Sequence, residues 1–329
     1  MKRAIIIGIS GQDGSYLAKL LLEKGYRVTG ITRDSLDFNS KGLRYLGIDS
    51  AIDFIELPVL DKDRILKILK KVKPDEIYNL SAQSSVGHSF VDPYTTLNFN
   101  ILSVLYWLEC IKSIDPSIKF YQASSSEMFG NVRESDLPLR ESLVFRPASP
   151  YGVSKAAAHW LVVNYRESNH MFCSCGILFN HESPLRGENY VVKKIINTAV
   201  KIKMGLMNGP LLLGNLQVKR DWGYAPDYVD AMWLILQNKE AGDFLICSGN
   251  VWSLKELAHY VFESLELDFN QYVNHNDALL RPVDLEIIYG DNTKAKELLG
   301  WNYNLSNQDL VDKLIAEETR FIEWELKTA

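Results

Sequence analysis

Short apolar runs alternate with longer amphipathic segments along the first half of the chain. Runs rich in β-branched and aromatic residues predict strands at residues 4–7, 26–32, 53–57, 76–80 and 119–123. Apolar residues at helical spacing fill the intervals between these runs. The alternation is typical of an α/β fold with a doubly wound parallel sheet, the Rossmann arrangement.

The pattern continues through a helix at about 149–168 and a strand at 171–179, and then becomes irregular. The polar segment 179–187 marks the crossing into a second lobe. We therefore expect a first domain over residues 1–178 and a smaller, mixed α/β lobe over 179–329. A helix and a short apolar strand at about 225–248 are expected to rejoin the first domain. A capping-box pattern, Ser253 with Glu256, opens a later helix.

A glycine-rich turn joins the first strand to the first helix. It contains Gly8, Ser10, Gly11, Gln12, Asp13 and Gly14. Glycines permit a tight turn and a close approach of the backbone to a pyrophosphate, which the helix N-terminus attracts. We expect these residues to bind a dinucleotide.

Further ligand-binding positions follow the later strands, because ligands of such sheets bind at the carboxyl edge. Leu80 and Ala82 are expected beside the cofactor, and Ser84 beside the substrate. Cofactor choice depends on the end of the second strand, where Arg33 favours the 2'-phosphate of NADP and Asp34 favours the ribose hydroxyls of NAD. The two stand side by side, so both cofactors remain open.

Tyr151 and Lys155 are four residues apart at the start of an apolar helix, so their side chains share one face. A nearby ammonium favours the phenolate and lowers the pKa of a tyrosine. The pair is a candidate general base. Ser125 and Glu127 follow the fifth strand at the same edge of the sheet.

Charge and composition exclude several classes of protein. A net charge of −5 without a basic run argues against a nucleic-acid or membrane-surface partner. No apolar run is long enough to span a bilayer. The four cysteines lack disulfide or zinc spacing, and the histidines share no metal-ligand spacing. We expect a cytoplasmic protein with reduced thiols and no metal.

Together these motifs resemble the extended short-chain dehydrogenase/reductases, and within them the GDP-mannose 4,6-dehydratase family. The resemblance covers nearly the whole chain. It is carried by residues 8–17, 120–127, 163–168, 176–184 and 220–223.

The resemblance implies catalytic roles for Ser125, Glu127, Tyr151 and Lys155. It implies that a GDP-sugar is held by Asn180, Arg186, Lys193, Arg220, Arg281 and Glu286. Arginines suit a diphosphate because each can make two parallel contacts. His181 is expected to order its loop. The family also implies a homo-oligomer, a tetramer if residues 33–41 interlock and otherwise a dimer.

Two departures from the family pattern fall in the cofactor site. Many members have two arginines after the second strand, whereas this chain has Arg33 and Asp34. After the third strand the family usually has Gly-Asp, whereas this chain has Leu57 and Pro58. These changes leave the choice between NADP and NAD open, and they raise the chance that the sugar chemistry has diverged.

The family mechanism begins when Tyr151 takes the C4 hydroxyl proton of a GDP-hexose and the hydride passes to the nicotinamide. Glu127 then removes the C5 proton, water leaves from C6, and the returned hydride completes a GDP-4-keto-6-deoxy sugar. A second hypothesis stops before dehydration, as a GDP-sugar C4 dehydrogenase, reductase or epimerase, which could act on GDP-manno-heptose. A third is a non-catalytic nucleotide sensor.

Overall fold

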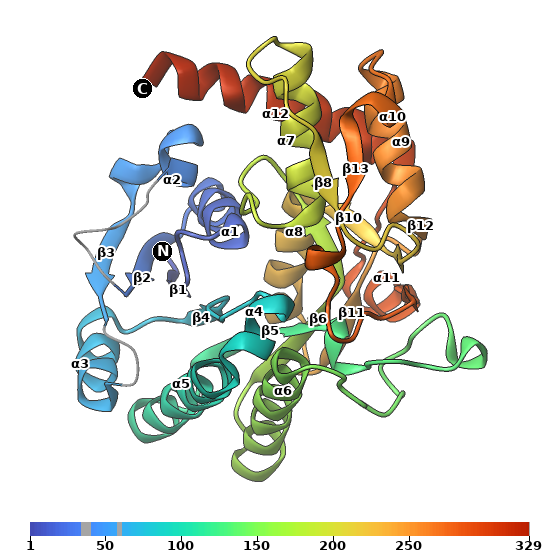
Figure 1. Cartoon of the computed structure of the whole chain (residues 1–329). Coiled ribbons are helices and arrows are strands. Elements are labelled where there is room, and N and C mark those ends of the chain that lie inside the picture. Colours follow the sequence, from blue (N-terminus) through green and yellow to red (C-terminus); the bar gives the residue numbers. More distant parts are fainter. Residues whose placement is uncertain (34–40, 58–60, 329) are drawn as a thin grey trace.

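A seven-stranded parallel sheet forms the centre of the computed structural model, which describes residues 1–33, 41–57 and 61–328 (Figure 1). The strand order is β11-β6-β5-β4-β1-β2-β3. The strands are β1 (Arg3–Ile7), β2 (Arg27–Thr32), β3 (Asp53–Glu56), β4 (Glu76–Asn79), β5 (Lys119–Ser125), β6 (Cys173–Leu178) and β11 (Asp243–Ile246). The predicted α/β fold with a parallel, doubly wound sheet is confirmed.

Helices cover both faces of this sheet (Figure 1). One face carries α1 (Gln12–Glu23) and α8 (Ala225–Gln237), and the other carries α3 (Lys62–Val72), α5 (Pro93–Ile114) and α6 (Pro150–Asn169). Trp107 of α5 is 2% exposed and packs with Phe120 of β5 in the hydrophobic core between the sheet and the face that carries α3, α5 and α6. Because both faces are covered, the strands read as continuous apolar runs.

The other elements of the described residues build the connections and the second lobe. The further helices are α2 (Lys41–Tyr45), α4 (Val86–Val91), α7 (Val191–Lys203), α9 (Leu254–Ser264), α10 (Phe269–Tyr272), α11 (Thr293–Leu299) and α12 (Asn307–Thr328), with 3-10 turns at Asp49–Ala51, Ser126–Met128, Glu134–Asp136 and Asp277–Leu279. Short strands pair in small sheets: β7 (Asn180–Glu182) with β10 (Trp222–Tyr224), β8 (Leu211–Leu213) with β13 (Val273–His275), and β9 (Lys219–Arg220) with β12 (Trp252–Ser253) and β14 (Ile287–Ile288).

Strand β11 returns to the main sheet after the chain has entered the second lobe. It pairs in parallel with β6, with Asp243 opposite Cys175 and Ile246 opposite Leu178. The capping box is also present, since Ser253 and Glu256 each accept a hydrogen bond from the other's backbone N–H. Among the described helices, none combines the length and apolar character that crossing a membrane requires.

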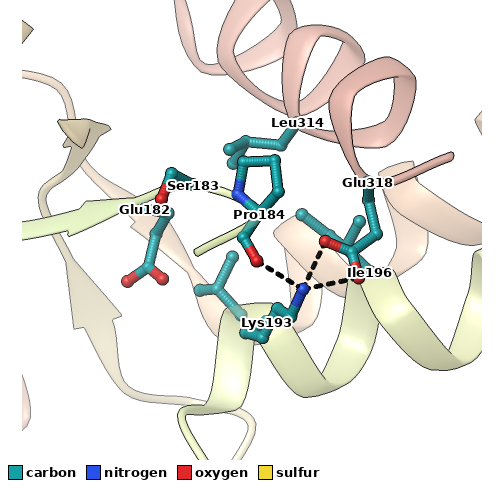
Figure 2. Close-up of a pocket in the computed structure, with 8 residues that line it drawn as sticks. Glu182, Ser183, Pro184, Lys193, Ile196, Leu314 and Glu318 are labelled. Carbon is teal, nitrogen blue, oxygen red and sulfur yellow. Dashed lines mark hydrogen bonds and ion pairs between the residues drawn. The ribbon is translucent and has the colours of Figure 1, made fainter. Parts of the chain in front are cut away.

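A buried ion pair joins α12 to α7 (Figure 2). Lys193 Nζ donates to the two carboxylate oxygens of Glu318, at 2.6 and 2.5 Å, and to the carbonyl oxygen of Pro184 at 2.8 Å. The side chains of Lys193 and Glu318 are only 3% and 2% exposed. Charges removed from water in this way require each other, because either one alone would be left without a partner. The pair also fixes the loop that contains Pro184.

The C-terminal part of α12 extends to helix α2 of the first domain (Figure 1). The Tyr45 ring lies 4.9 Å from Phe321 and 5.4 Å from Trp324, both in edge-on geometry. Lys41 forms an ion pair with Glu325. Helix α12 thus contacts both the second lobe and helix α2 of the first domain.

We expect Glu318→Gln to destabilise the protein by about 3 kcal/mol, because it leaves the Lys193 ammonium buried without a counter-charge. Chemical denaturation measures this loss. The matched control is Glu266→Gln, which breaks the exposed Lys203–Glu266 pair at 2.8 Å and should cost at most about 1 kcal/mol. The double change Lys193→Met with Glu318→Leu should recover most of the loss; equal effects of the two single Gln variants would contradict the argument.

We expect a homo-oligomer that pairs through α5 and α6. Large apolar side chains are exposed there, with Tyr94 at 78% and Trp160 at 58%, and burying such residues favours association. Light scattering at micromolar concentration should give a multiple of the protomer mass, and Trp160→Glu should reduce it. Leu298→Glu, which changes an exposed leucine on α11 (57%), should leave the mass unchanged. A monomeric wild-type protein would refute the prediction.

Candidate active site

The glycine turn between β1 and α1 has the geometry that a bound pyrophosphate requires. Gly8 has a φ of +87°, a backbone conformation that glycine adopts most readily. A Cβ on Gly14 would lie 2.4 Å from the carbonyl oxygen of Gly8, so only glycine lets the helix start this close to the turn. Gly11 caps α1 without a side-chain hydrogen bond, which leaves N–H groups of the first turn available to an anion. Ser10 is exposed at the same turn.

The first turn of α1 is bound to the loop that follows β6. Gln12 Nε2 donates to the carbonyl oxygen of His181 at 3.1 Å, and Ser183 Oγ donates to Gln12 Oε1 at 2.8 Å. His181 Nε2 lies 3.0 Å from both oxygens of Asp13. Burial acts to raise the pKa of Asp13, but its charge interaction and hydrogen bond with His181 outweigh burial and lower that pKa to about 2. These contacts give His181 the ordering role that the sequence indicates.

The segment after β4 forms the next part of the edge. Leu80 N–H donates to the carbonyl oxygen of Ile7 at 3.0 Å, so Leu80 and the half-buried Ala82 lie beside the glycine turn. Ser84 lies farther out, where its hydroxyl is 2.7 Å from the Tyr190 hydroxyl. Leu80, Ala82 and Ser84 thus follow one another along this edge of the sheet, and their roles as cofactor and substrate contacts stay predictions.

Arg33 ends the described part of the segment after β2, and its guanidinium carbon lies 6.0 Å from the centre of the Phe99 ring. Asp34 and Pro58, on which the choice of cofactor was expected to depend, lie outside the described residues.

The candidate catalytic residues Ser125 and Tyr151 meet where β5 ends and α6 begins. Helix α6 starts at Pro150 and is capped by Ser149, whose hydroxyl accepts a hydrogen bond from Gly152 N–H at 3.0 Å. This cap places Tyr151 in the first turn, where it is 8% exposed. Ser125 is the last residue of β5, and its hydroxyl lies near enough to the Tyr151 phenol to act on the pKa of that phenol.

Lys155 lies over the Tyr151 ring, and its expected effect on the pKa of Tyr151 stays a prediction. Burial raises the pKa of Tyr151, while the Ser125 hydroxyl and the charge of Arg186 act to lower it. Lys155 Nζ donates to the carbonyl oxygen of Ala123 at 2.5 Å and lies 6.0 Å from the centre of the Tyr151 ring. Burial lowers the pKa of Lys155 itself to about 8. Spacing along a helix indicated a shared face, but it could not show the acceptor on β5.

Glu127 lies one short turn beyond β5, in the 3-10 segment Ser126–Met128. Its backbone N–H donates to Ser125 Oγ at 3.2 Å. Burial raises the pKa of Glu127, and the charges of Arg220 and Arg281 oppose this effect. A carboxylate with a raised pKa is a stronger base than one in water, so Glu127 is suited to accept a proton.

Two arginines and one aspartate face Glu127 from the second lobe. Arg220 Nη2 lies 3.1 Å from Asp284 Oδ1, and Arg281 Nη1 lies 3.8 Å from the same oxygen. A pocket between the lobes is lined by Glu127, Ser149, Arg281 and Asp284. Two guanidinium groups that share one carboxylate form a site suited to an anion.

Arg186 forms a second cationic position near Tyr151. Its guanidinium carbon lies 3.8 Å from the centre of the Tyr190 ring, and its Nε lies 3.7 Å from Glu182 Oε2. Among the described residues, Arg186 Nε has no hydrogen-bond acceptor. Asn180 begins β7 and is half-buried opposite Trp222 of β10.

Two expected substrate residues lie apart from this group. All three donors of Lys193 Nζ are directed at Glu318 and Pro184, and Glu286 is exposed with its backbone carbonyl oxygen bound to Lys219 N–H. Their contacts with a substrate stay predictions.

Sequence reasoning missed Asp284 and Tyr190. The spacing of three residues from Arg281 could have pointed to Asp284, because it brings the two side chains within ion-pair range.

Comparisons with known proteins agree with this arrangement. A family model described as GDP-mannose 4,6 dehydratase matches residues 5–314. GDP-mannose 4,6 dehydratase 2 from Arabidopsis thaliana is 42% identical, with 96% of this chain and 87% of the relative aligned. GDP-mannose 4,6 dehydratase from Homo sapiens is 41% identical, with 95% and 90% aligned.

The fold is shared with more distant enzymes. The crystal structure of dTDP-glucose 4,6-dehydratase from Bacillus anthracis in complex with NAD superposes with a TM-score of 0.86, although the two sequences are only 16% identical. The alignment covers 98% of each chain. On the extent and identity of the sequence matches, the chain belongs to the GDP-mannose 4,6-dehydratase family.

Proposed function

We propose that the protein is an NAD(P)-dependent GDP-mannose 4,6-dehydratase that forms GDP-4-keto-6-deoxy-mannose. The observation that carries this proposal is the position of Glu127, a half-buried carboxylate with raised pKa, next to the Ser125–Tyr151 pair and the Arg220–Arg281 group. A dehydratase needs a carboxylate base there in addition to the residues that serve C4 oxidation.

The residues present fit a nicotinamide dinucleotide. Gly8, Gly11 and Gly14 leave no side chain in the turn, Leu80 and Ala82 line the neighbouring edge, and Arg33 follows β2. These residues would hold the cofactor, with its pyrophosphate at the N-terminus of α1. When bound, the nicotinamide supplies a hydride acceptor for the first step and a hydride donor for the last.

Three arginines near the candidate catalytic residues support a GDP-sugar as substrate. Arg220 and Arg281 act on Glu127, and Arg186 acts on Tyr151 and has an Nε that is free of hydrogen bonds to described residues. A diphosphate offers several oxygens to such groups. Asn180 and Ser84 add polar contacts, and Asp284 is placed to accept from a hydroxyl.

The proton transfers then belong to residues at the end of β5 and the start of α6. Tyr151 takes the proton of the C4 hydroxyl, which Ser125 orients, and the positive charge of Arg186 lowers the cost of the phenolate. The resulting C4 ketone acidifies the proton at C5. Glu127 removes that proton and gives it to the hydroxyl that leaves C6, so that the second step releases one water.

We expect Glu127→Gln to remove dehydration but to retain C4 oxidation, because Ser125 and Tyr151 act without it. Loss of a positioned base should lower the rate about 10²- to 10⁴-fold. Mass spectrometry of GDP-mannose incubations measures the loss of water, and Tyr151→Phe should stop both halves. Sugar labelled with deuterium at C4 should carry the label at C6 in the wild-type product. A wild-type product of undiminished oxygen content would refute dehydration and favour a GDP-sugar 4-dehydrogenase or epimerase.

We expect the purified protein to retain its dinucleotide, because the cycle regenerates the cofactor without exchange. Arg33 favours NADP, and nucleotide released by heat identifies it. Arg33→Ala should weaken NADP binding about 10-fold, the loss of one charge-assisted hydrogen bond, and should leave NAD binding unchanged. Retention of NAD alone, or equal weakening for both nucleotides, would show that Arg33 does not select the 2'-phosphate.

A further inference from the structure

A buried histidine lies behind the catalytic pair, on the face of α6 that packs on the sheet. His159 is one helical turn beyond Lys155 and is 3% exposed. Its Nδ1 lies 3.1 Å from Ser124 Oγ, and its Nε2 lies 3.9 Å from Asp243 Oδ2. Both ring nitrogens therefore face polar groups in a site closed to water.

Asp243 is itself held in place. Arg166, two turns farther along α6, donates to its two carboxylate oxygens at 2.9 and 2.7 Å and to the carbonyl oxygen of Cys173 at 3.0 Å. The neighbours of the His159 ring indicate which nitrogen carries the proton. Nε2–H faces the Asp243 carboxylate, and Nδ1 accepts from the Ser124 hydroxyl.

Ser124 stands between two residues that matter to the proposed chemistry. It precedes Ser125, which lies near Tyr151, and it follows Ala123, whose carbonyl oxygen accepts from Lys155. Two consecutive residues of β5 are thus bound to two side chains one turn apart on α6. The hydrogen bonds at Ala123 and Ser124 fix the register of the helix against the strand.

We infer that His159 is a positioning residue, which sets the separation of Ser125 from Tyr151 by binding β5 to α6 through Ser124. The inference rests on the proposed roles of Ser125 and Tyr151. His159 touches neither residue, so its effect on the reaction is transmitted by the strand. An error of about 1 Å between reacting groups can cost about 10²-fold in rate, which gives such a register contact a measurable role.

The same cluster suggests a metal site at first sight, because ligand atoms of His159, Cys175 and Asp243 lie within 4.8 Å of one another. Arg166 argues against it. Its guanidinium already occupies both oxygens of Asp243, and its positive charge would stand beside any cation. A hydrogen-bonded network satisfies the same groups without that repulsion.

The test compares His159→Phe, which keeps a buried ring but loses the hydrogen bond with Ser124 and the contact with Asp243, with Ser124→Ala and with the double variant. Tyr121→Phe is the matched control: it removes a buried hydroxyl from the same strand, and that hydroxyl has no hydrogen-bond partner among the described residues. We expect each single variant to lower kcat about 10-fold with KM for GDP-mannose unchanged, since the candidate substrate arginines lie elsewhere. The double variant should be no slower than either single one, and Tyr121→Phe should match the wild type.

A pH profile separates this role from simple packing. His159 faces Asp243 of β11, Cys175 of β6, Ser124 of β5 and Arg166 of its own helix. Burial lowers the pKa of His159, although Asp243 opposes the shift. Protonation at acid pH removes the acceptor at Nδ1, so the ratio of wild-type kcat to that of His159→Phe should shrink as the pH falls below the ordinary pKa range of a histidine.

Hydrogen exchange tests the inference whatever the substrate proves to be. Peptides covering 119–127 and 150–160 should exchange faster in His159→Phe and Ser124→Ala, and not in Tyr121→Phe. Unchanged exchange, or kcat losses that multiply in the double variant, would overturn the inference. Stoichiometric zinc in the wild-type protein that is lost in His159→Phe would overturn it in favour of a metal site. If the wild-type protein leaves GDP-mannose unconverted, the proposed function fails and the exchange result alone decides the positioning role.

Discussion

The contact between Asp13 and His181 determines how the two parts of the site lie against each other. A carboxylate in the first turn of a buried helix requires a partner, and His181 supplies it at 3.0 Å from a loop of the second lobe. Ser183 adds a hydrogen bond to Gln12 at 2.8 Å. Because this loop leads directly to Arg186 and Tyr190, the junction that fixes the glycine turn also places the cationic side of the substrate cleft.

The same burial acts differently on each ionisable group of the site. It raises the pKa of Glu127 and of Tyr151, and it lowers the pKa of Lys155 to about 8. Burial brings the pKa of Lys155 and of Glu127 closer to physiological pH, whereas it moves the pKa of Tyr151 farther away, so the phenolate depends on the positive charges and hydroxyl groups around it. The closed edge of a parallel sheet thus provides both the positions of the groups and their acid–base behaviour.

Much of the fold could be predicted from the sequence because local pattern and tertiary role agree. The central strands β1, β4, β5 and β6 are buried, whereas the edge strand β3 is largely exposed. Gly8 and Gly14 mark a turn in which a side chain would collide with the backbone. Contacts between side chains that lie far apart in the sequence had no such local signal. Nothing in the local sequence showed that Lys155 would bind Ala123, that Lys193 would face Glu318 across 125 positions, or that Asp284 would join Arg220 and Arg281.

The carboxylate of Asp284 has a consequence for how ligands enter and leave. It sits 3.1 Å from Arg220 and 3.8 Å from Arg281, and so it serves as an internal counterion that keeps both guanidinium groups in place when no ligand is bound. Any anion that occupies the cleft must compete with this resident carboxylate, and any anion that departs is replaced by it. Such a competition lowers the net affinity for an anion, and it keeps the two arginines ordered between one anion and the next.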